Sequence, residues 1–213
     1  MGRLAAVTRR VEVHGTRGHG ARGKRMNTIC PRGTADAAAE RLPRTWARAQ
    51  ARRWPTGRPG RPGGLALDLP DRFLDDAFAP GAVVRFEDVD FPSVLSHEPT
   101  RRFLREIGLP EREYGFELDT EIPLPTLTEH AEYEELLAGQ ACEPRPLPRA
   151  ADRLIRLGSV LPGTDLLLDG PTGEVLCWRA PDPTPHPLTA DLSTLTVTLW
   201  LLHRERRTAA LRG

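Results

Sequence analysis

Short apolar runs separated by turn residues dominate Arg153–Trp178 (RLIRLGSVLPGTDLLLDGPTGEVLCW). The runs lie in Leu154–Leu157, Leu166–Leu168 and Val175–Trp178, and the segments between them contain Gly and Pro. Glycine readily adopts the positive φ that a hairpin needs, and proline fixes the start of a turn. The spacing therefore predicts an antiparallel meander. Because the strands are apolar on both faces, we expect them in the middle of a sheet.

A well-delimited helix is predicted over Glu98–Ile107. Pro99 suits its first turn, Gly108 fits the position just after its end, and Pro110 prevents its continuation. The apolar stripe of this helix consists of Phe103, Leu104 and Ile107. Two weaker signals precede it. The segment Asp71–Phe78 has helical spacing, and a short strand is expected over 83–86.

Apolar and acidic residues alternate in Phe116–Ile122 (FELDTEI), which predicts a strand with one wet, acidic face. Thr126 and Glu129 then have the spacing of a capping box. The box opens a predicted helix that runs to Leu137. We expect its large apolar residues, Tyr133, Leu136 and Leu137, to face inward.

The sequence after Trp178 predicts an irregular segment followed by a last helix. Pro181–Pro187 (PDPTPHP) cannot join a sheet interior, since proline lacks the amide proton that a central strand donates. Asp191 or Ser193 then caps a helix over Thr194–Arg206. Together these elements predict an α+β fold, in which helices flank a central antiparallel sheet.

The net charge of +1 conceals two unlike halves. Residues 1–64 carry fifteen Lys and Arg against three acids, a net charge of +12, whereas residues 65–213 carry fifteen Arg against twenty-six acids, a net charge of −11. The first half has few large apolar residues, so we expect a disordered basic tail over 1–64. The predicted domain covers 65–207, followed by a short tail over 208–213.

Two alternatives stay open for the basic tail. It could bind nucleic acid nonspecifically through its arginines, as part of a regulatory protein. It could also result from a start codon assigned too far upstream. A start near residue 65 would need a non-ATG codon, because Met1 and Met26 are the only methionines.

Catalytic, cofactor and metal sites are not indicated. Gly18–Arg25 (GHGARGKR) nearly matches a phosphate-binding loop, but Arg25 replaces the hydroxyl residue that would bind Mg²⁺. The three cysteines are too far apart for a metal knuckle. The histidines of the predicted domain stand apart from one another along the sequence, without the spacing of a catalytic motif. The sequence thus predicts a protein that is not an enzyme and that uses no cofactor.

The compartment expected from the sequence is the cytoplasm. No apolar run is long enough to span a bilayer, and the basic N-terminus lacks the apolar region of a secretory signal. An odd number of widely spaced cysteines suits a reducing environment.

Several motifs resemble the SUKH superfamily of immunity proteins, specifically its fourth family. They are VVRFEDVDFP (83–92), HEPTRRFLREIGLP (97–110), RLGSVLPGTDLLLDGPTGEV (156–175) and the last helix with its Leu-Trp pair. The resemblance covers about residues 65–207 and none of 1–64. It implies a Smi/Knr-like α+β fold and a role as the cytoplasmic antidote of a bacterial polymorphic toxin, often one that acts on nucleic acid. It implies no catalytic residues. Such relatives would have further helical sequence after the last helix, so a truncated copy is also an expectation.

The resemblance and the charge together predict a toxin-neutralising protein that works by occlusion. A domain of charge −11 attracts cationic proteins and can imitate the phosphates that fill a basic groove. The predicted partner-binding carboxylates lie on the acidic strand and the following helix: Glu117, Asp119, Glu121, Glu129, Glu132, Glu134 and Glu135. The cognate toxin and the oligomeric state stay open.

Overall fold

A computed structural model describes residues 64–113, 115–120, 123–138 and 145–211. Its elements, in chain order, are β1 (Val83–Val84), η1 (Asp88–Asp90), α2 (Glu98–Glu106), β2 (Leu109–Pro110), β3 (Arg112–Glu113), β4 (Phe116–Leu118), α3 (Leu127–Ala138), β5 (Leu154–Ser159), β6 (Asp165–Asp169), β7 (Val175–Trp178), β8 (His186–Thr189) and α4 (Leu192–Ala210). The predicted disordered tail lies outside the described residues except for Gly64.

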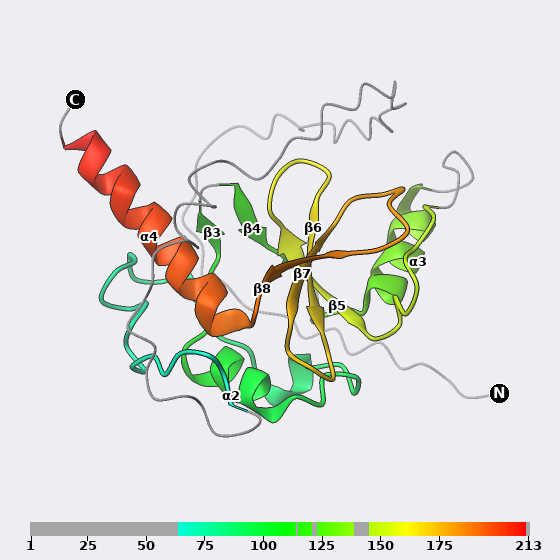
Figure 1. Cartoon of the computed structure of the whole chain (residues 1–213), viewed down its shortest axis with the longest axis horizontal. Coiled ribbons are helices and arrows are strands. Elements are labelled where there is room, and N and C mark those ends of the chain that lie inside the picture. Colours follow the sequence, from blue (N-terminus) through cyan, green and yellow to red (C-terminus); the bar gives the residue numbers. More distant parts are fainter. Residues whose placement is uncertain (1–63, 114, 121–122, 139–144, 212–213) are drawn as a thin grey trace, which may run out of the picture. The chain divides into compact units, whose positions relative to one another are not determined.

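Six antiparallel strands form the main sheet in the order β3-β4-β5-β6-β7-β8, and β1 pairs with β2 in a separate small sheet. The strands follow one another in sequence, so the predicted meander is confirmed (Figure 1). All five residues of β6 are buried, as expected for a central strand. Within the described residues the α+β prediction is confirmed.

Side chains of the central strand alternate between two hydrophobic clusters. Leu166 and Leu168 join the larger cluster, which contains residues of α2 and α4. Leu167 joins a smaller cluster that contains Leu127 of α3 and Trp178 of β7. The larger core therefore lies on the α2 and α4 side of the sheet, and α3 covers the opposite face. Figure 1 shows α3 on the other side of the strands from α4.

Several local predictions are confirmed at their caps. Gly108 follows α2 with φ +79°, and its amide donates to the carbonyl of Phe103 at 2.9 Å. Asp191 caps α4 by accepting from the Thr194 amide at 3.0 Å. The helix continues to Ala210, beyond the Arg206 that the sequence predicts.

Three local predictions differ from the structure. Asp71–Phe78 forms successive turns in place of a regular helix. The acidic strand is shorter than predicted: β4 ends at Leu118, Asp119 and Thr120 are not part of a strand, and residues 121–122 lie outside the described residues. The predicted irregular segment contributes His186 and Pro187 to β8, which is tolerated because β8 is an edge strand of the sheet.

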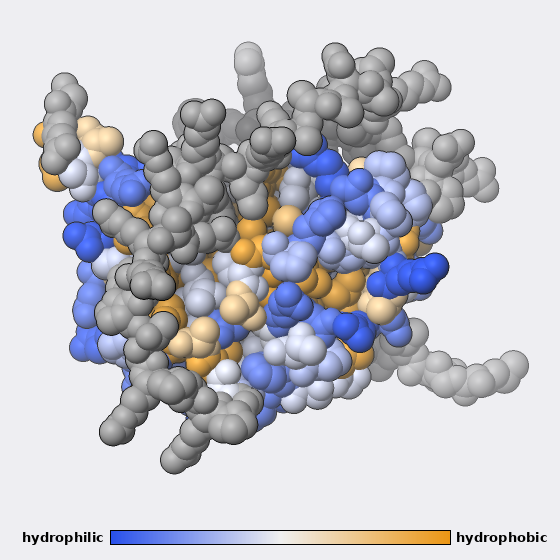
Figure 2. Space-filling model, viewed as in Figure 1, coloured by the Kyte–Doolittle hydropathy of each residue, from blue (hydrophilic) through white to orange (hydrophobic). Residues whose placement is uncertain are grey.

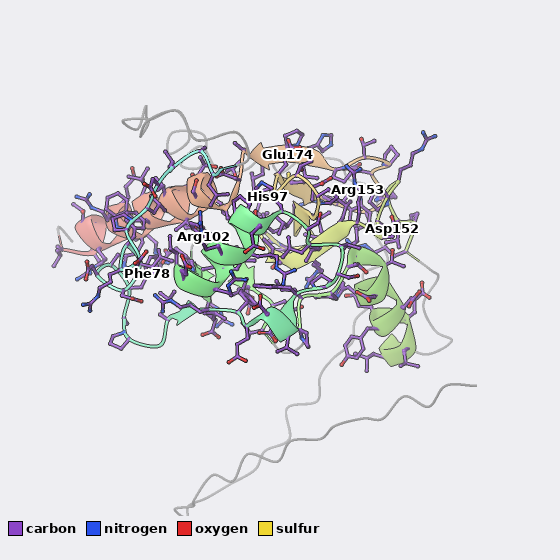
Figure 3. All side chains as sticks on the ribbon, turned by 90° about the horizontal axis from the view of Figure 1, so that it is seen from below. Phe78, His97, Arg102, Asp152, Arg153 and Glu174 are labelled. Carbon is purple, nitrogen blue, oxygen red and sulfur yellow. The ribbon has the colours of Figure 1, made fainter. Side chains whose placement is uncertain are left out.

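Two of the sequence motifs meet where the β6–β7 turn contacts the start of α2. The His97 amide donates to the Gly170 carbonyl at 3.1 Å, and the His97 ring lies 2.8 Å from the Thr100 hydroxyl. A Cβ on Gly173 would come within 2.4 Å of His97 Nδ1. Figure 3 labels His97 and Glu174 on the two sides of this contact. The glycine of the turn is therefore required by packing.

We expect Gly173→Ala to lower the free energy of unfolding by about 2 kcal/mol, because alanine adds both backbone strain and a clash. Gly163→Ala is a matched control. Gly163 has nearly the same φ (+73° against +75°), yet nothing lies within 4 Å of its Cβ position. Its cost should be about 1 kcal/mol, from strain alone. Urea denaturation of both variants measures the difference, and equal losses would show that the His97 contact contributes nothing.

Candidate partner-binding surface

The carboxylates predicted to bind a partner do not form one uniform acidic face. Glu117 is exposed on β4 and pairs with Arg112. Glu132 and Glu135 are exposed on α3 and make no ion pair within the part of the chain that the structure describes. Glu121 lies outside the described residues. Their role in binding a partner stays a prediction.

The remaining three predicted residues, Asp119, Glu129 and Glu134, also hold the fold together. Glu129 completes the predicted capping box, since its Oε2 accepts from the Thr126 amide at 2.8 Å while the Glu129 amide donates to the Thr126 hydroxyl at 3.2 Å. Asp119 accepts from Arg156 Nη1 at 2.7 Å. Glu134 lies 3.3 Å from the ring of His130 and 3.8 Å from Arg145.

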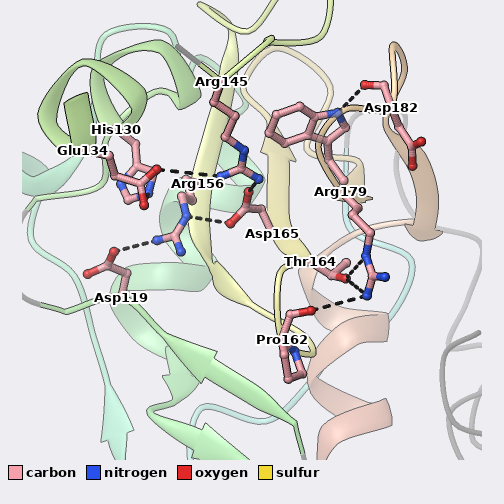
Figure 4. Close-up of polar contacts among 11 residues, drawn as sticks. Asp119, His130, Glu134, Arg145, Arg156, Pro162, Thr164, Asp165, Arg179 and Asp182 are labelled. Carbon is pink, nitrogen blue, oxygen red and sulfur yellow. Dashed lines mark hydrogen bonds and ion pairs between the residues drawn. The ribbon is translucent and has the colours of Figure 1, made fainter. Parts of the chain in front are cut away.

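Asp119 and Glu134 are the two ends of a chain of alternating charges (Figure 4). Arg156 of β5 joins Asp119 to Asp165 of β6, with its Nε donating to Asp165 Oδ1 at 3.0 Å. Arg145 donates to the other oxygen of Asp165 at 2.6 Å and approaches Glu134. The side chains of Arg156 and Asp165 are only 14% and 7% exposed. We call these five residues the ion-pair chain.

Glu134 and Arg145, at one end of the ion-pair chain, connect α3 to the sheet. The guanidinium of Arg145 also lies over the Trp178 ring, 4.5 Å from its centroid. The contact with the buried His130 ring, together with the charge of Arg145, holds the pKa of Glu134 below its usual range. Glu134 therefore stays ionised at neutral pH and keeps its attraction for Arg145.

The sequence does carry a signal for the ion-pair chain. Arg156 interrupts an apolar strand, and Asp165 begins the next one. Charges within strands that are otherwise apolar need partners, because desolvating an unpaired charge is costly. Which carboxylates pair with Arg156 depends on strand register and on a segment 37 residues away, so pattern analysis of single segments misses it.

The prediction that the large apolar residues of α3 face inward is wrong. Tyr133, Leu136 and Leu137 are exposed, whereas Leu127, His130 and Ala131 are buried. The reason is the way the helix begins. The capping box fixes its start, and the Arg156 amide, donating to Pro125, anchors that start to β5. Residues 127 and 131 then point to the sheet, and residues 133, 136 and 137 occupy other faces.

A polar hollow of about 370 Å³ lies beside β4, between Arg112, Glu117, Asp119, Arg156 and Ser159. Four of its charged side chains pair with one another, Arg112 with Glu117 and Arg156 with Asp119, and Glu111 also lines it. Among the residues that the structure describes, no group of three His, Cys, Asp or Glu side chains could hold a metal ion. In the same residues no helix has the length and apolar character needed to cross a membrane.

Comparison with known proteins gives one family. The model of the SUKH-4 immunity protein family matches residues 69–212, which include every element of the structure from β1 to α4. Neither the curated proteins nor the solved structures contain a match to the chain. Two of the motifs that carry the resemblance, 97–110 and 156–175, meet at the α2 start and the β6–β7 turn, where Gly173 leaves no room for a Cβ. The chain belongs to the SUKH-4 immunity protein family.

Proposed function

We propose that this protein neutralises the cognate toxin of a bacterial polymorphic toxin system by binding it and covering its working surface. Membership of the immunity family supports the general role. The observation that carries the occlusion mechanism is the charge of residues 65–213, with twenty-six acids against fifteen arginines. A domain with this net negative charge attracts basic proteins and orients their approach.

The class of toxin proposed is one that acts on nucleic acid. Proteins that bind nucleic acid place Lys and Arg where the phosphates lie, so an acidic protein can occupy the same groove. The exposed carboxylates of α3, Glu132 and Glu135, make no ion pair within the described residues, and Glu117 of β4 is exposed but pairs with Arg112. The family is generally non-enzymatic, which agrees with neutralisation by binding alone.

The compartment proposed is the cytoplasm, where a toxin that acts on nucleic acid would meet its target. Cys177 is a free, half-buried thiol, and burial raises its pKa, so the thiol stays protonated. A free thiol is compatible with a reducing compartment.

The test uses the toxin domain that this proposal predicts to be encoded beside the gene of this chain. Co-expression of the full chain should restore growth to cells that make the toxin domain. The two purified proteins, with the toxin domain inactivated by substitution, should form a 1:1 complex on size-exclusion chromatography. Growth rescue without a complex would refute neutralisation by binding, and absence of both would refute the proposed function for this toxin.

The ion-pair chain limits which substitutions can test the acidic surface. Reversing Asp119 or Glu134 to lysine would place a cation beside Arg156 or Arg145, and reversing Glu129 would remove the capping box. A loss of binding in those variants could therefore reflect loss of folding. Glu132 and Glu135 are free of this difficulty, since they are exposed and have no such role within the described residues.

A further inference from the structure

We propose that the outward face of α3 is the main contact for the toxin, and that it fits a basic surface containing an apolar recess. This inference rests on the proposed function and specifies its contact surface. The residues concerned, called the α3 patch below, are Glu132, Tyr133, Glu135, Leu136 and Leu137. They combine apolar area with carboxylates in less than two turns of helix.

The apolar part of the α3 patch is unusual for this molecule. Leu136 is 78% exposed, Leu137 69% and Tyr133 44%. The other exposed large hydrophobic residues of the described chain stand singly, Val89 in η1 and Leu211 just after α4. Scattered exposed apolar residues are normal, but several that gather in one place typically mark an interaction site. Figure 2 shows hydrophilic and hydrophobic residues mixed on the face of the molecule that it presents.

The carboxylates of the α3 patch determine what kind of partner fits. With 3.6 residues per turn, Glu132 and Glu135 lie along one side of Leu136, and Tyr133 and Leu137 lie along the other. A second copy bound through the same patch would bring four carboxylates into one contact, and like charges in an interface are unfavourable. A partner with arginine or lysine around an apolar recess satisfies both halves of the patch.

The structure holds the α3 patch in a fixed orientation. The capping box and the bond from the Arg156 amide to Pro125 fix the start of the helix. Leu127 packs the helix against the sheet, Ala131 is buried beside it, and the contact of Glu134 with Arg145 connects the middle of the helix to β6 through Asp165. A rigid contact surface binds more tightly because less freedom is lost on association.

The test measures the affinity of the full chain for the inactivated toxin domain by calorimetry. We expect Leu136→Asn with Leu137→Asn to weaken binding about 100-fold, since two central apolar contacts are lost. Glu132→Lys with Glu135→Lys should weaken it about 30-fold and reduce its dependence on salt. The control combines Val89→Asn with Glu205→Lys, an exposed apolar and an exposed acidic residue elsewhere, and should stay within about twofold of the parent.

The outcomes separate this inference from the proposed function. If the parent chain binds the toxin domain and the Leu136/Leu137 variant binds equally well, the α3 patch is wrong and the proposed function stands. If the parent does not bind, the proposed function fails. If the parent is a dimer that the variant converts to a monomer, a second copy covers the patch and the inference is wrong. It is also wrong if, without toxin, trypsin cleaves residues 1–64 faster in the variant, because the chain's own basic segment then covers the patch.

Discussion

Replacing Arg156 by methionine is expected to lower the free energy of unfolding by about 3–4 kcal/mol. The guanidinium joins Asp119 to Asp165, and both Arg156 and Asp165 are almost fully buried. Removing one member of a buried ion pair leaves a charge without its partner in a medium of low polarity. Asp165 would keep Arg145, but Asp119 would lose an ion-pair partner. The effect is measured by urea denaturation at neutral pH.

The control for this prediction is Arg112→Met. Arg112 also pairs with a carboxylate, that of Glu117, but both side chains are exposed, so the loss should be about 0.5 kcal/mol or less. A loss for Arg156→Met within 1 kcal/mol of that for Arg112→Met would show that the ion-pair chain does not stabilise the fold. A double variant, Arg156→Met with Asp119→Leu, should recover part of the loss, because it removes the carboxylate along with its partner.

Asp191→Ala is expected to lower the free energy of unfolding by about 3 kcal/mol. Its carboxylate accepts from the Thr194 amide at 3.0 Å and from the Ser193 hydroxyl at 2.7 Å, and it also accepts from the Ala66 amide. Loss of a helix N-cap costs about 1–2 kcal/mol, and buried donors left without an acceptor add to this. The variant should also release the segment around Leu67, which packs against α4.

The matched variant is Asp191→Asn. Its amide oxygen can still accept from Thr194, but its amino group cannot accept from Ala66, so about 1 kcal/mol should be lost. Amide hydrogen exchange at Ala66 and Leu67 reports the loss of the Ala66 contact separately from the loss of the helix cap. The exchange should rise in both variants, whereas only Asp191→Ala loses the cap. A loss below 1 kcal/mol for Asp191→Ala, with unchanged exchange at these amides, would contradict this account of the α4 start.

The features of the fold that could be predicted are those with local signals. The Gly108 end of α2, the capping box of Thr126 and Glu129, and the cap at Asp191 each depend on a few neighbouring residues. The meander follows from turn residues between short apolar runs. Such signals require no knowledge of what packs against the segment, so reading them from the sequence is sufficient.

The orientation of α3 could not be predicted in this way. Hydrophobic side chains normally face the core, and on that rule Tyr133, Leu136 and Leu137 should be buried. The helix instead packs through Leu127 and the small Ala131, with His130 between them. This orientation of α3 depends on the contacts of Pro125 and Thr126 with Arg156 and Ile155 of β5. Those contacts link residues about 30 positions apart.

The sequence could not show which of the predicted carboxylates already have partners in the fold, for the same reason. Charge pattern identifies acidic residues but does not say which of them already have a partner in the fold. Asp119 and Glu134 pair with arginines of the ion-pair chain, whereas Glu132 and Glu135 are exposed beside apolar side chains. The proposed contact is therefore the α3 patch, which is smaller than the predicted acidic strand and helix. In this patch exposed apolar area is as important as charge.

The most direct test of neutralisation by occlusion is the inhibition of the active toxin domain by the full chain at several concentrations of the toxin's own substrate. Occlusion predicts that inhibition is complete at one molecule of this protein per toxin domain, and that the apparent inhibition constant rises linearly with substrate concentration. An inhibition constant that does not change with substrate, or inactivation of many toxin molecules by one molecule of this protein, would contradict it.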